Sequence, residues 1–324
     1  MKQLKKKMLL VFVLLLSAIT ALSGCSSSGA GGYPEKTIKI IVPWGAGGDT
    51  DVINRIAAKY LEEELGGKIT IQNIGGGSGS IGAQEAIGAE PDGYTLLAGH
   101  DSIGISKLMG QTDFDYFALE PVSLLTSAPQ LIATHVDNPW DSMQDVVDQL
   151  KQEPESISFG ASIGSTSHMV PLGIQDAAGV KFNIVGYDGT AKRTQALLGK
   201  HLDFGATTIP AAQEYMKANQ LKILGIATEK RTAALPDVPT LKEQGIDFTN
   251  ATNRGIFAPK GTPEEIIKTL SDAIKKVAEN PEFIKEMENM GVELRYMDHE
   301  KYSKHLQGDV DYLGGLLKRQ GVID

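Results

Sequence analysis

The chain is poor in cysteine, in aromatic side chains and in basic residues. Its 324 residues include one Cys and two Trp, aromatic residues make up 6%, and 31 Lys and Arg stand against 40 Asp and Glu. The net charge of −9 argues against nucleic acid and against electrostatic docking on anionic lipid. An anionic ligand is not excluded, because backbone N–H groups can bind an anion without a basic side chain.

The single cysteine, Cys25, ends a pattern typical of an export signal. Four lysines in the first seven residues precede an apolar run from Met8 to about Thr20, which is too short to cross a bilayer with certainty. Leu22–Cys25 resembles the lipobox of bacterial lipoproteins. We therefore expect a signal peptide over residues 1–24 and a mature chain held by lipid on Cys25 at the extracytoplasmic face of the cell membrane. A cleaved signal without lipid, or a single membrane helix, is the alternative.

A tether is expected to separate this anchor from the folded part of the chain. After Cys25, the segment up to residue 32 contains only Ser, Gly and Ala, which cannot bury apolar surface. About 290 residues remain from Tyr33 onward, enough for one large or two medium domains. With Cys25 lipidated, no thiol is left for disulfides, metal ligation or catalysis.

Strand and helix patterns alternate along the folded part, which predicts an α/β fold with parallel-rich sheets flanked by helices. Ligands of such sheets bind beyond the carboxyl ends of the strands. Strands are expected at 37–42, 68–73, 94–98, 122–125, 130–135, 157–159, 181–185, 204–207, 222–227 and 255–259, and helices at 50–65, 81–88, 142–152, 168–178, 191–198, 210–218 and from about 263 and 299.

The loop after the first expected strand, residues 43–51, is the first candidate ligand site. It reads Pro-Trp-Gly-Ala-Gly-Gly-Asp-Thr-Asp and opens a helix. Glycine lets the backbone approach a ligand closely, and the free N–H groups of a helix N-terminus favour a carboxylate or phosphate. A tight turn capped by Thr50 or Asp51 is the alternative. The candidate residues here are Trp44, Gly45, Ala46, Gly47, Gly48 and Asp51.

A second glycine loop has the form of a dinucleotide fingerprint. Gly77, Gly79 and Gly82 match G-x-G-x-x-G between a strand and a helix, with Asp101 about 20 residues on. Free dinucleotides are scarce outside the membrane, so the expected location argues against this interpretation. No cofactor is therefore expected.

The third loop offers a serine in the setting of a nucleophile elbow. Gly160–Gly164 reads G-x-S-x-G, and Asp203 followed by His299 or His305 gives the chain order of a hydrolase triad around Ser162. No oxyanion segment of the His-Gly-Gly type precedes it. A secreted serine hydrolase is the alternative to a loop whose hydroxyls and amides hold an oxygen-rich ligand.

Two further features are weaker. His100 and Asp101 could begin a metal site, but no third and fourth ligand follow at a usual spacing, so a hydrogen-bonded pair is favoured. Tyr187 stands in a turn between Gly186 and Gly189 and is a candidate wall of a cleft.

Ordered motifs across nearly the whole exported chain resemble the substrate-binding receptors of tripartite tricarboxylate transporters, the TctC-like or Bug proteins. No single motif is specific, but their number and order are. They are Tyr33-Pro34, Pro43-Trp44 with Gly47-Gly48, Asp51 and Arg55, Asn73, Ile81-Gly82-Ala83, Pro91–Leu97, Pro121–Ser123, Gly164-Ser165 with His168, Tyr187 with Gly189, Leu198-Gly199 with Asp203, Pro236–Gly245 and Ala258–Pro263.

The resemblance implies a two-lobed flytrap of the type II binding-protein kind, without catalysis. One lobe spans 33–130 plus 254–324 and the other 131–253, with hinges near 127–131 and 251–255. A small organic carboxylate lies between the lobes, and the closed form, a monomer, docks on a membrane permease; a sensory role with a membrane kinase is the alternative partner. Beyond the first loop, the ligand-binding residues implied are Ser102, Ser162, Gly164, Ser165, Thr166, Tyr187, Gly189 and Asp203.

The sequence departs from the family in three places. Gly45-Ala46 and Gly186 stand where proline is usual, and Asp188 replaces a usual basic residue. An acid facing the cleft disfavours a distal carboxylate, so the ligand is expected to be a monocarboxylate, an amino-bearing acid or an aromatic acid if Asp188 faces inward.

Overall fold

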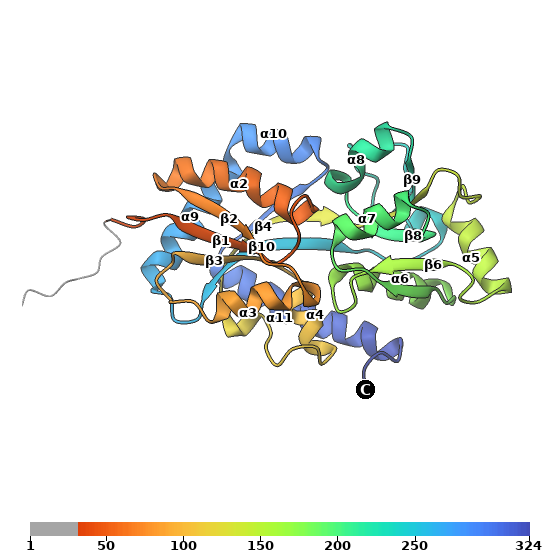
Figure 1. The fold of residues 1–324 in the computed structure, drawn as a ribbon, viewed down its shortest axis with the longest axis horizontal. Coiled ribbons are helices and arrows are strands. Elements are labelled where there is room, and N and C mark those ends of the chain that lie inside the picture. Colours follow the sequence, from red (N-terminus) through yellow and green to blue (C-terminus); the bar gives the residue numbers. More distant parts are fainter. Residues whose placement is uncertain (1–31) are drawn as a thin grey trace, which may run out of the picture. The chain divides into compact units, whose positions relative to one another are not determined.

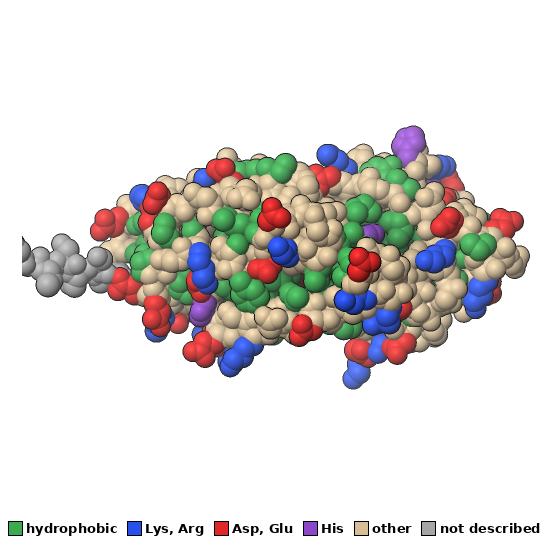
Figure 2. All heavy atoms as spheres, turned by 90° about the horizontal axis from the view of Figure 1, so that it is seen from below, with side chains coloured by type: hydrophobic (Ala, Val, Ile, Leu, Met, Phe, Trp, Pro, Cys, Tyr) green, Lys and Arg blue, Asp and Glu red, His purple; other side chains and the backbone are tan. Residues whose placement is uncertain are grey.

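A computed structural model describes residues 32–324, which form two β-sheets with helices packed on both faces of each (Figure 1). The expected signal peptide, Cys25 and nearly all of the tether lie outside the described residues. Within the described residues, no helix is both long and apolar enough to cross a membrane. The face in Figure 2 carries basic and acidic side chains interspersed.

The first sheet has six strands in the order β11-β4-β10-β3-β1-β2. The pairs of β1 with β2 and with β3 are parallel, whereas β10 and β11 run antiparallel to their neighbours. We call this sheet and its helices the first lobe. Its elements are β1 (Ile38–Val42), α2 (Asp49–Leu65), β2 (Ile69–Asn73), α3 (Ser80–Ile87), β3 (Thr95–His100), α4 (Ser102–Leu108), β4 (Leu119–Pro129), β10 (Ala251–Pro259), α9 (Glu264–Glu279), α10 (Pro281–Asn289), β11 (Glu293–Met297) and α11 (His299–Arg319).

Helices α2, α9 and α10 cover one face of this sheet, and α3, α4 and α11 cover the other (Figure 1). Strand β1 shows why both faces are buried. Its side chains alternate, so Ile38 and Ile40 enter the core under α2 while Ile41 enters the core under α3.

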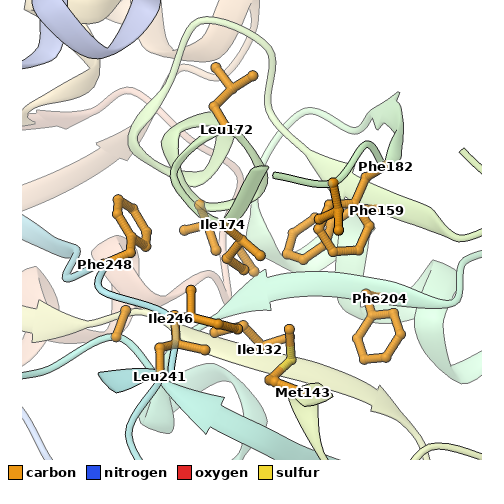
Figure 3. Close-up of a cluster of buried hydrophobic side chains, with 14 of the residues drawn as sticks. Ile132, Met143, Phe159, Leu172, Ile174, Phe182, Phe204, Leu241, Ile246 and Phe248 are labelled. Carbon is orange, nitrogen blue, oxygen red and sulfur yellow. The ribbon is translucent and has the colours of Figure 1, made fainter. Parts of the chain in front are cut away.

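The second sheet has five strands in the order β7-β6-β8-β5-β9, with parallel pairs around β6 and antiparallel pairs around β5. We call it and its helices the second lobe. Phe159, Phe182 and Phe204 form the aromatic part of its core (Figure 3). Its elements are β5 (Leu131–His135), α5 (Met143–Gln152), β6 (Ser158–Ala161), α6 (Thr166–Ala178), β7 (Asn183–Gly186), α7 (Thr190–Leu198), β8 (Phe204–Thr207), α8 (Ile209–Lys217) and β9 (Leu221–Ile226).

The chain passes between the lobes at two paired strands. Strand β4 leads directly into β5, and β10 brings the chain back beside β4, with Ala251 opposite Pro129. The C-terminal helix makes a third connection. The sequence assigned 254–324 to the first lobe, but Leu313, Leu316 and Leu317 of α11 lie in the core cluster of the second lobe, against α6.

The mixed α/β fold is confirmed. Each predicted strand and helix is present, with the predicted ends for β8 and shifted ends for most of the others. Ser142 is the N-cap of α5, where its hydroxyl and the Asp145 side chain form a capping box. Pro263 lies at the N-cap of α9. Helices α4 and α10 and strand β11 were not predicted.

Candidate functional site

A cavity of about 370 Å³ lies between the two lobes. Its lining comes from the loops at the carboxyl ends of β1, β2, β3, β6 and β7 and from the hinge strand β10. This is the position expected for a ligand of an open α/β sheet.

An indole forms the wall of the first lobe. Trp44 stacks on the imidazole of His100, with ring centroids 3.7 Å apart and planes 8° from parallel. The backbone of Gly79 lies close to the same indole, since a Cβ placed there would be 2.7 Å from Trp44 Cζ2. The glycine loop therefore serves to pack this wall.

His100 is a neutral imidazole. Burial, and then the positive charge of Arg254, hold the pKa of His100 well below its usual value. The Ser102 N–H donates to His100 Nδ1 over 3.2 Å, which places the proton on Nε2. His100 thus lines the cavity as a neutral imidazole with its proton on Nε2.

In the second lobe, Ser162 and Arg193 form a polar floor. The Ser162 hydroxyl donates to the carbonyl of Tyr187 over 2.7 Å and accepts from the Gly189 N–H over 2.9 Å. Arg193 donates through Nη1 to Ser162 Oγ over 3.2 Å and through Nε to the carbonyl of Ala206. Burial lowers the pKa of Arg193 to about 10, so it remains a cation at neutral pH.

A buried ion pair lies on the hinge side of the cavity. Arg254 of β10 donates through Nη2 to Asp49 Oδ2, at the first residue of α2. Arg254 also donates through Nε to Thr50 Oγ1 over 3.0 Å. Burial raises the pKa of the Asp49 carboxyl, but the positive charges of Arg254 and Arg193 and the hydrogen bond from the Thr50 N–H outweigh it, so the net shift is downward.

The loops of the two lobes touch across the cleft. Ser78 Oγ donates to the carbonyl of Ile163 over 2.6 Å, and Ser106 Oγ donates to the carbonyl of Gly164 over 3.0 Å. These contacts join residues of the first lobe to the loop after β6, so the lobes are closed on the cavity.

The cavity brings together seven of the residues expected at the ligand site. It does not bring Ala46, Gly47, Asp51, Ser102, Gly164, Tyr187 or Asp203 to its lining. The lining includes Trp44, Gly45, Gly48, Ser162, Ser165, Thr166 and Gly189, and also Asp188.

Several of the residues outside the lining position those within it. Asp51 accepts from the Gly47 N–H and from Asn73, whose amide also donates to the carbonyl of Trp44, so Asp51 fixes the shape of the first loop. Ser102 bonds His100, as described. The Tyr187 side chain packs against the core cluster that contains Ala196 and Leu197 and does not form the expected wall of the cavity.

Asp203 lies at the opposite end of the second sheet. It precedes β8, and its carboxylate accepts from the N–H and the hydroxyl of Ser158 at the start of β6. The cavity lies beyond the other end of these parallel strands, after Ala161. Asp203 therefore joins two strand beginnings.

The hydrolase alternative is not supported. The Ser162 hydroxyl already donates to a backbone carbonyl, while His299 and His305 belong to α11 of the first lobe. His305 faces Asp309, at 3.3 Å, and His299 bonds the carbonyl of Pro121. In the part of the chain that the structure describes, neither of these histidines is therefore placed to activate Ser162.

The positions of the side chains do not support the dinucleotide or the metal alternative either. Asp101 accepts from the backbone and side-chain N–H groups of Asn253, so it is not free for a ribose. Among residues 32–324, no group of three or more His, Cys, Asp or Glu side chains is placed to hold a metal ion.

Sequence reasoning missed the charged residues of the site. Arg193, Arg254 and Asp49 all line the cavity and are at most 8% exposed. Arg254 had a local signal, because it directly precedes the apolar strand segment Gly255–Pro259, where a charge needs a partner. Arg193 had none, since its helix begins with a polar run.

Comparisons with known proteins place this geometry in context. The model for the tripartite tricarboxylate transporter family receptor matches residues 53–322. A UPF0065 protein in the TAR-I ttuE-ttuC' intergenic region of Agrobacterium vitis is 32% identical over 265 residues, covering 80% of this chain and 76% of that protein. Protein BugT of Bordetella pertussis is 31% identical over 257 residues, covering 76% and 78%.

Comparison with solved structures points to the same kind of protein as these sequence comparisons do. The periplasmic binding protein BugD has a TM-score of 0.84 at 28% identity, covering 90% of this chain and 99% of that chain. MatC from Rhodopseudomonas palustris, with bound malate, has a TM-score of 0.82 at 25% identity, covering 88% and 100%. A second R. palustris protein, with adipate, has a TM-score of 0.83 at 25% identity, covering 89% and 98%.

Proposed function

The chain belongs to the tripartite tricarboxylate transporter receptor family, and from this we propose that it captures a small organic carboxylate in the cleft between its lobes and delivers it to a membrane permease. Members of this family are solute-binding receptors and not enzymes. The proposal concerns the ligand, its anchoring and its delivery in this chain.

The observation that carries the proposal is the buried guanidinium of Arg193. Its side chain is 3% exposed, and in the described chain its hydrogen bonds go to neutral oxygens, those of Ala206, Ser162 and Thr190. The Asp49 carboxylate lies near Arg193 but reaches it only through Thr190 Oγ1, and Asp49 is itself paired with Arg254. A buried guanidinium without a directly bonded carboxylate is costly, and a ligand carboxylate in the cavity supplies that direct partner. A guanidinium also matches a carboxylate with two parallel hydrogen bonds.

Hydroxyl and amide donors next to Arg193 support the same ligand. Thr166 is the first residue of α6, and Thr190 is the first residue of α7, so the N-termini of two helices open on the cavity. Unpaired N–H groups and the helix dipole favour an anion there. The relatives with malate and with adipate, both organic acids, point to the same class of ligand.

Capture proceeds by closure of the two lobes about the β4–β5 passage and β10. A ligand that contacts both lobes binds the closed state better than the open one and so shifts the equilibrium toward closure. Trp44 and His100 on one side and Ser162 and Arg193 on the other meet the same cavity, which gives the ligand that differential contact.

The proposal also includes a lipid anchor on Cys25 and a membrane permease that receives the ligand. Lipid on Cys25 holds the receptor at the extracytoplasmic face, from which it delivers its ligand to the permease. Labelling intact cells with radioactive palmitate tests the anchor. Label on the native chain and its absence from Cys25→Ala is the expected result.

Ligand binding is tested by thermal unfolding of the chain from Ser26 onward against mono-, di- and tricarboxylates. A ligand at 100 times its Kd adds about 2.7 kcal/mol to the free energy of unfolding, which is a shift of several degrees. The matching amides, which lack the charge, serve as controls. A carboxylate-specific shift supports the proposal, and no shift with any carboxylate contradicts it.

A further inference from the structure

The carboxylate of Asp49 is held like a bound ligand. It accepts from the Thr50 N–H over 2.9 Å, from Thr190 Oγ1 over 3.2 Å and from Thr208 Oγ1 over 3.1 Å, in addition to the ion pair with Arg254. Asp49 itself is 8% exposed and lines the cavity.

These partners are the kinds of group that bind a free carboxylate. They comprise a guanidinium, two hydroxyls and a helix N-terminus, since Asp49 is the first residue of α2 and Gly48 contributes no side-chain cap. They also come from both lobes, because Thr190 and Thr208 belong to the second lobe while Arg254 and α2 belong to the first. A solute that closes a two-lobed receptor makes contacts of this kind.

Two buried arginines line the cavity, and one of them, Arg193, is available to a ligand carboxylate. Asp49 pairs directly with Arg254, whereas Arg193 bonds neutral oxygens and meets the Asp49 carboxylate only through the Thr190 hydroxyl. Asp188 also lines the cavity, and its Oδ1 is buried without a hydrogen-bond partner in the described chain. A second ligand carboxylate would therefore meet Asp49 and Asp188 with no unpaired buried cation to offset them.

We propose that Asp49 is a built-in carboxylate that fills one of two anion subsites in the cleft, so that the receptor selects acids with a single carboxylate, bound at Arg193. This inference rests on the proposed function and names the ligand class for the same site. Removing the charge of Asp49 frees Arg254 and its neighbouring hydroxyls, and opens the second subsite to a dicarboxylate.

Isothermal titration calorimetry with pairs of acids that differ by one carboxylate tests this. Suitable pairs are butyrate and succinate, hexanoate and adipate, and benzoate and terephthalate, all at pH 7.5. We expect the wild-type chain to bind the monocarboxylate of at least one pair at least tenfold more tightly than its dicarboxylate. In Asp49→Asn, which keeps the side-chain shape, we expect that ratio to reverse.

Glu63→Gln is the matched control. It changes an exposed acid on the same helix, α2, that lies outside the cavity lining, and we expect it to keep the wild-type ratio. Because Arg254 is left unpaired, Asp49→Asn is also expected to unfold at a lower temperature, and succinate should restore more of its Tm than butyrate does.

The outcomes separate the two proposals. If the wild-type chain binds succinate or adipate as tightly as its monocarboxylate partner, the Asp49 inference is wrong and the carboxylate receptor stands. If an Asp49→Asn variant that folds keeps the wild-type ratio, the inference is also wrong. If no acid of any pair binds, the proposed function itself fails. The wild-type comparison needs no variant, so it decides even if Asp49→Asn does not fold.

Discussion

Trp44 and His100 form a face-to-face stack, with ring centroids 3.7 Å apart, which joins the loop after β1 to the end of β3. The stack fixes two walls of the cavity relative to each other. The indole of this stack also lies close to the backbone of Gly79, which has a φ of +100°. The glycine loop, the indole and the imidazole thus form one packed layer behind the ligand.

Gly79→Ala should disturb this layer. Its φ is unfavourable for alanine, and the new Cβ would lie 2.7 Å from Trp44 Cζ2. We expect a loss of about 1–3 kcal/mol in the free energy of unfolding and at least tenfold weaker carboxylate binding. Denaturant unfolding and calorimetry measure the two effects.

Gly88→Ala is the control for that change. Gly79 is the N-cap of α3 and Gly88 is its C-cap, with a φ of −81°. A Cβ at Gly88 would lie 3.6 Å from its nearest atom, which is an ordinary van der Waals contact. We expect neutral or slightly raised stability and unchanged binding. Equal effects of the two substitutions would contradict the packing role of Gly79.

The connection made by α11 predicts a stability effect far from the cavity. Leu317 is fully buried in the core of the second lobe, so Leu317→Ala should cost about 2–5 kcal/mol. Tyr312 on the same helix is 57% exposed, and Tyr312→Ala should cost under about 0.5 kcal/mol. Urea unfolding compares them, and a small loss for Leu317→Ala would show that α11 does not bind the second lobe in solution.

Asp101 predicts a pH dependence of stability. Burial and the negative charge of Asp309 raise the pKa of Asp101 to about 8, against about 3.9 in an unfolded chain. Between about pH 3.9 and pH 8, the folded state therefore holds a proton on Asp101 that the unfolded state has released. Stability from this group is present below about pH 4 and falls as the pH rises toward 8.

Asp101→Asn removes this titration while keeping the shape of the side chain. We expect the Tm of the variant relative to wild type to rise between pH 5 and pH 8.5, by more than about 2 °C. His305, whose pKa burial lowers, acts in the opposite direction but is present in both proteins. A constant Tm difference across this range would contradict the raised pKa.

The loops around the cavity were predictable from sequence, because glycines between a strand and a helix signal where a backbone must turn tightly. Trp44, Ser162 and Thr166 stand in such loops and all line the cavity. The charged partners were harder to find. That Asp49 meets Arg254, 205 residues away, depends on how β10 returns beside β3.

The unpredicted elements have similar causes. Helix α4 is only seven residues long and contains Gly104, a poor helix former, which is needed because a Cβ there would lie 2.4 Å from the Tyr116 ring. The helical pattern of α11 was recognised, but sequence does not say that one helix packs on two cores. Both the formation of α4 and the packing of α11 on two cores depend on tertiary contacts, which local sequence patterns do not show.

The role of Arg193 is the central claim, and calorimetric titration of a bound carboxylate with wild type and Arg193→Met tests it most directly. Lys192→Met, which removes the neighbouring exposed cation on the cavity lining, is the control. We predict that Arg193→Met weakens binding at least 100-fold and that Lys192→Met weakens it less than threefold. Binding by Arg193→Met within threefold of wild type would contradict a carboxylate held by that guanidinium.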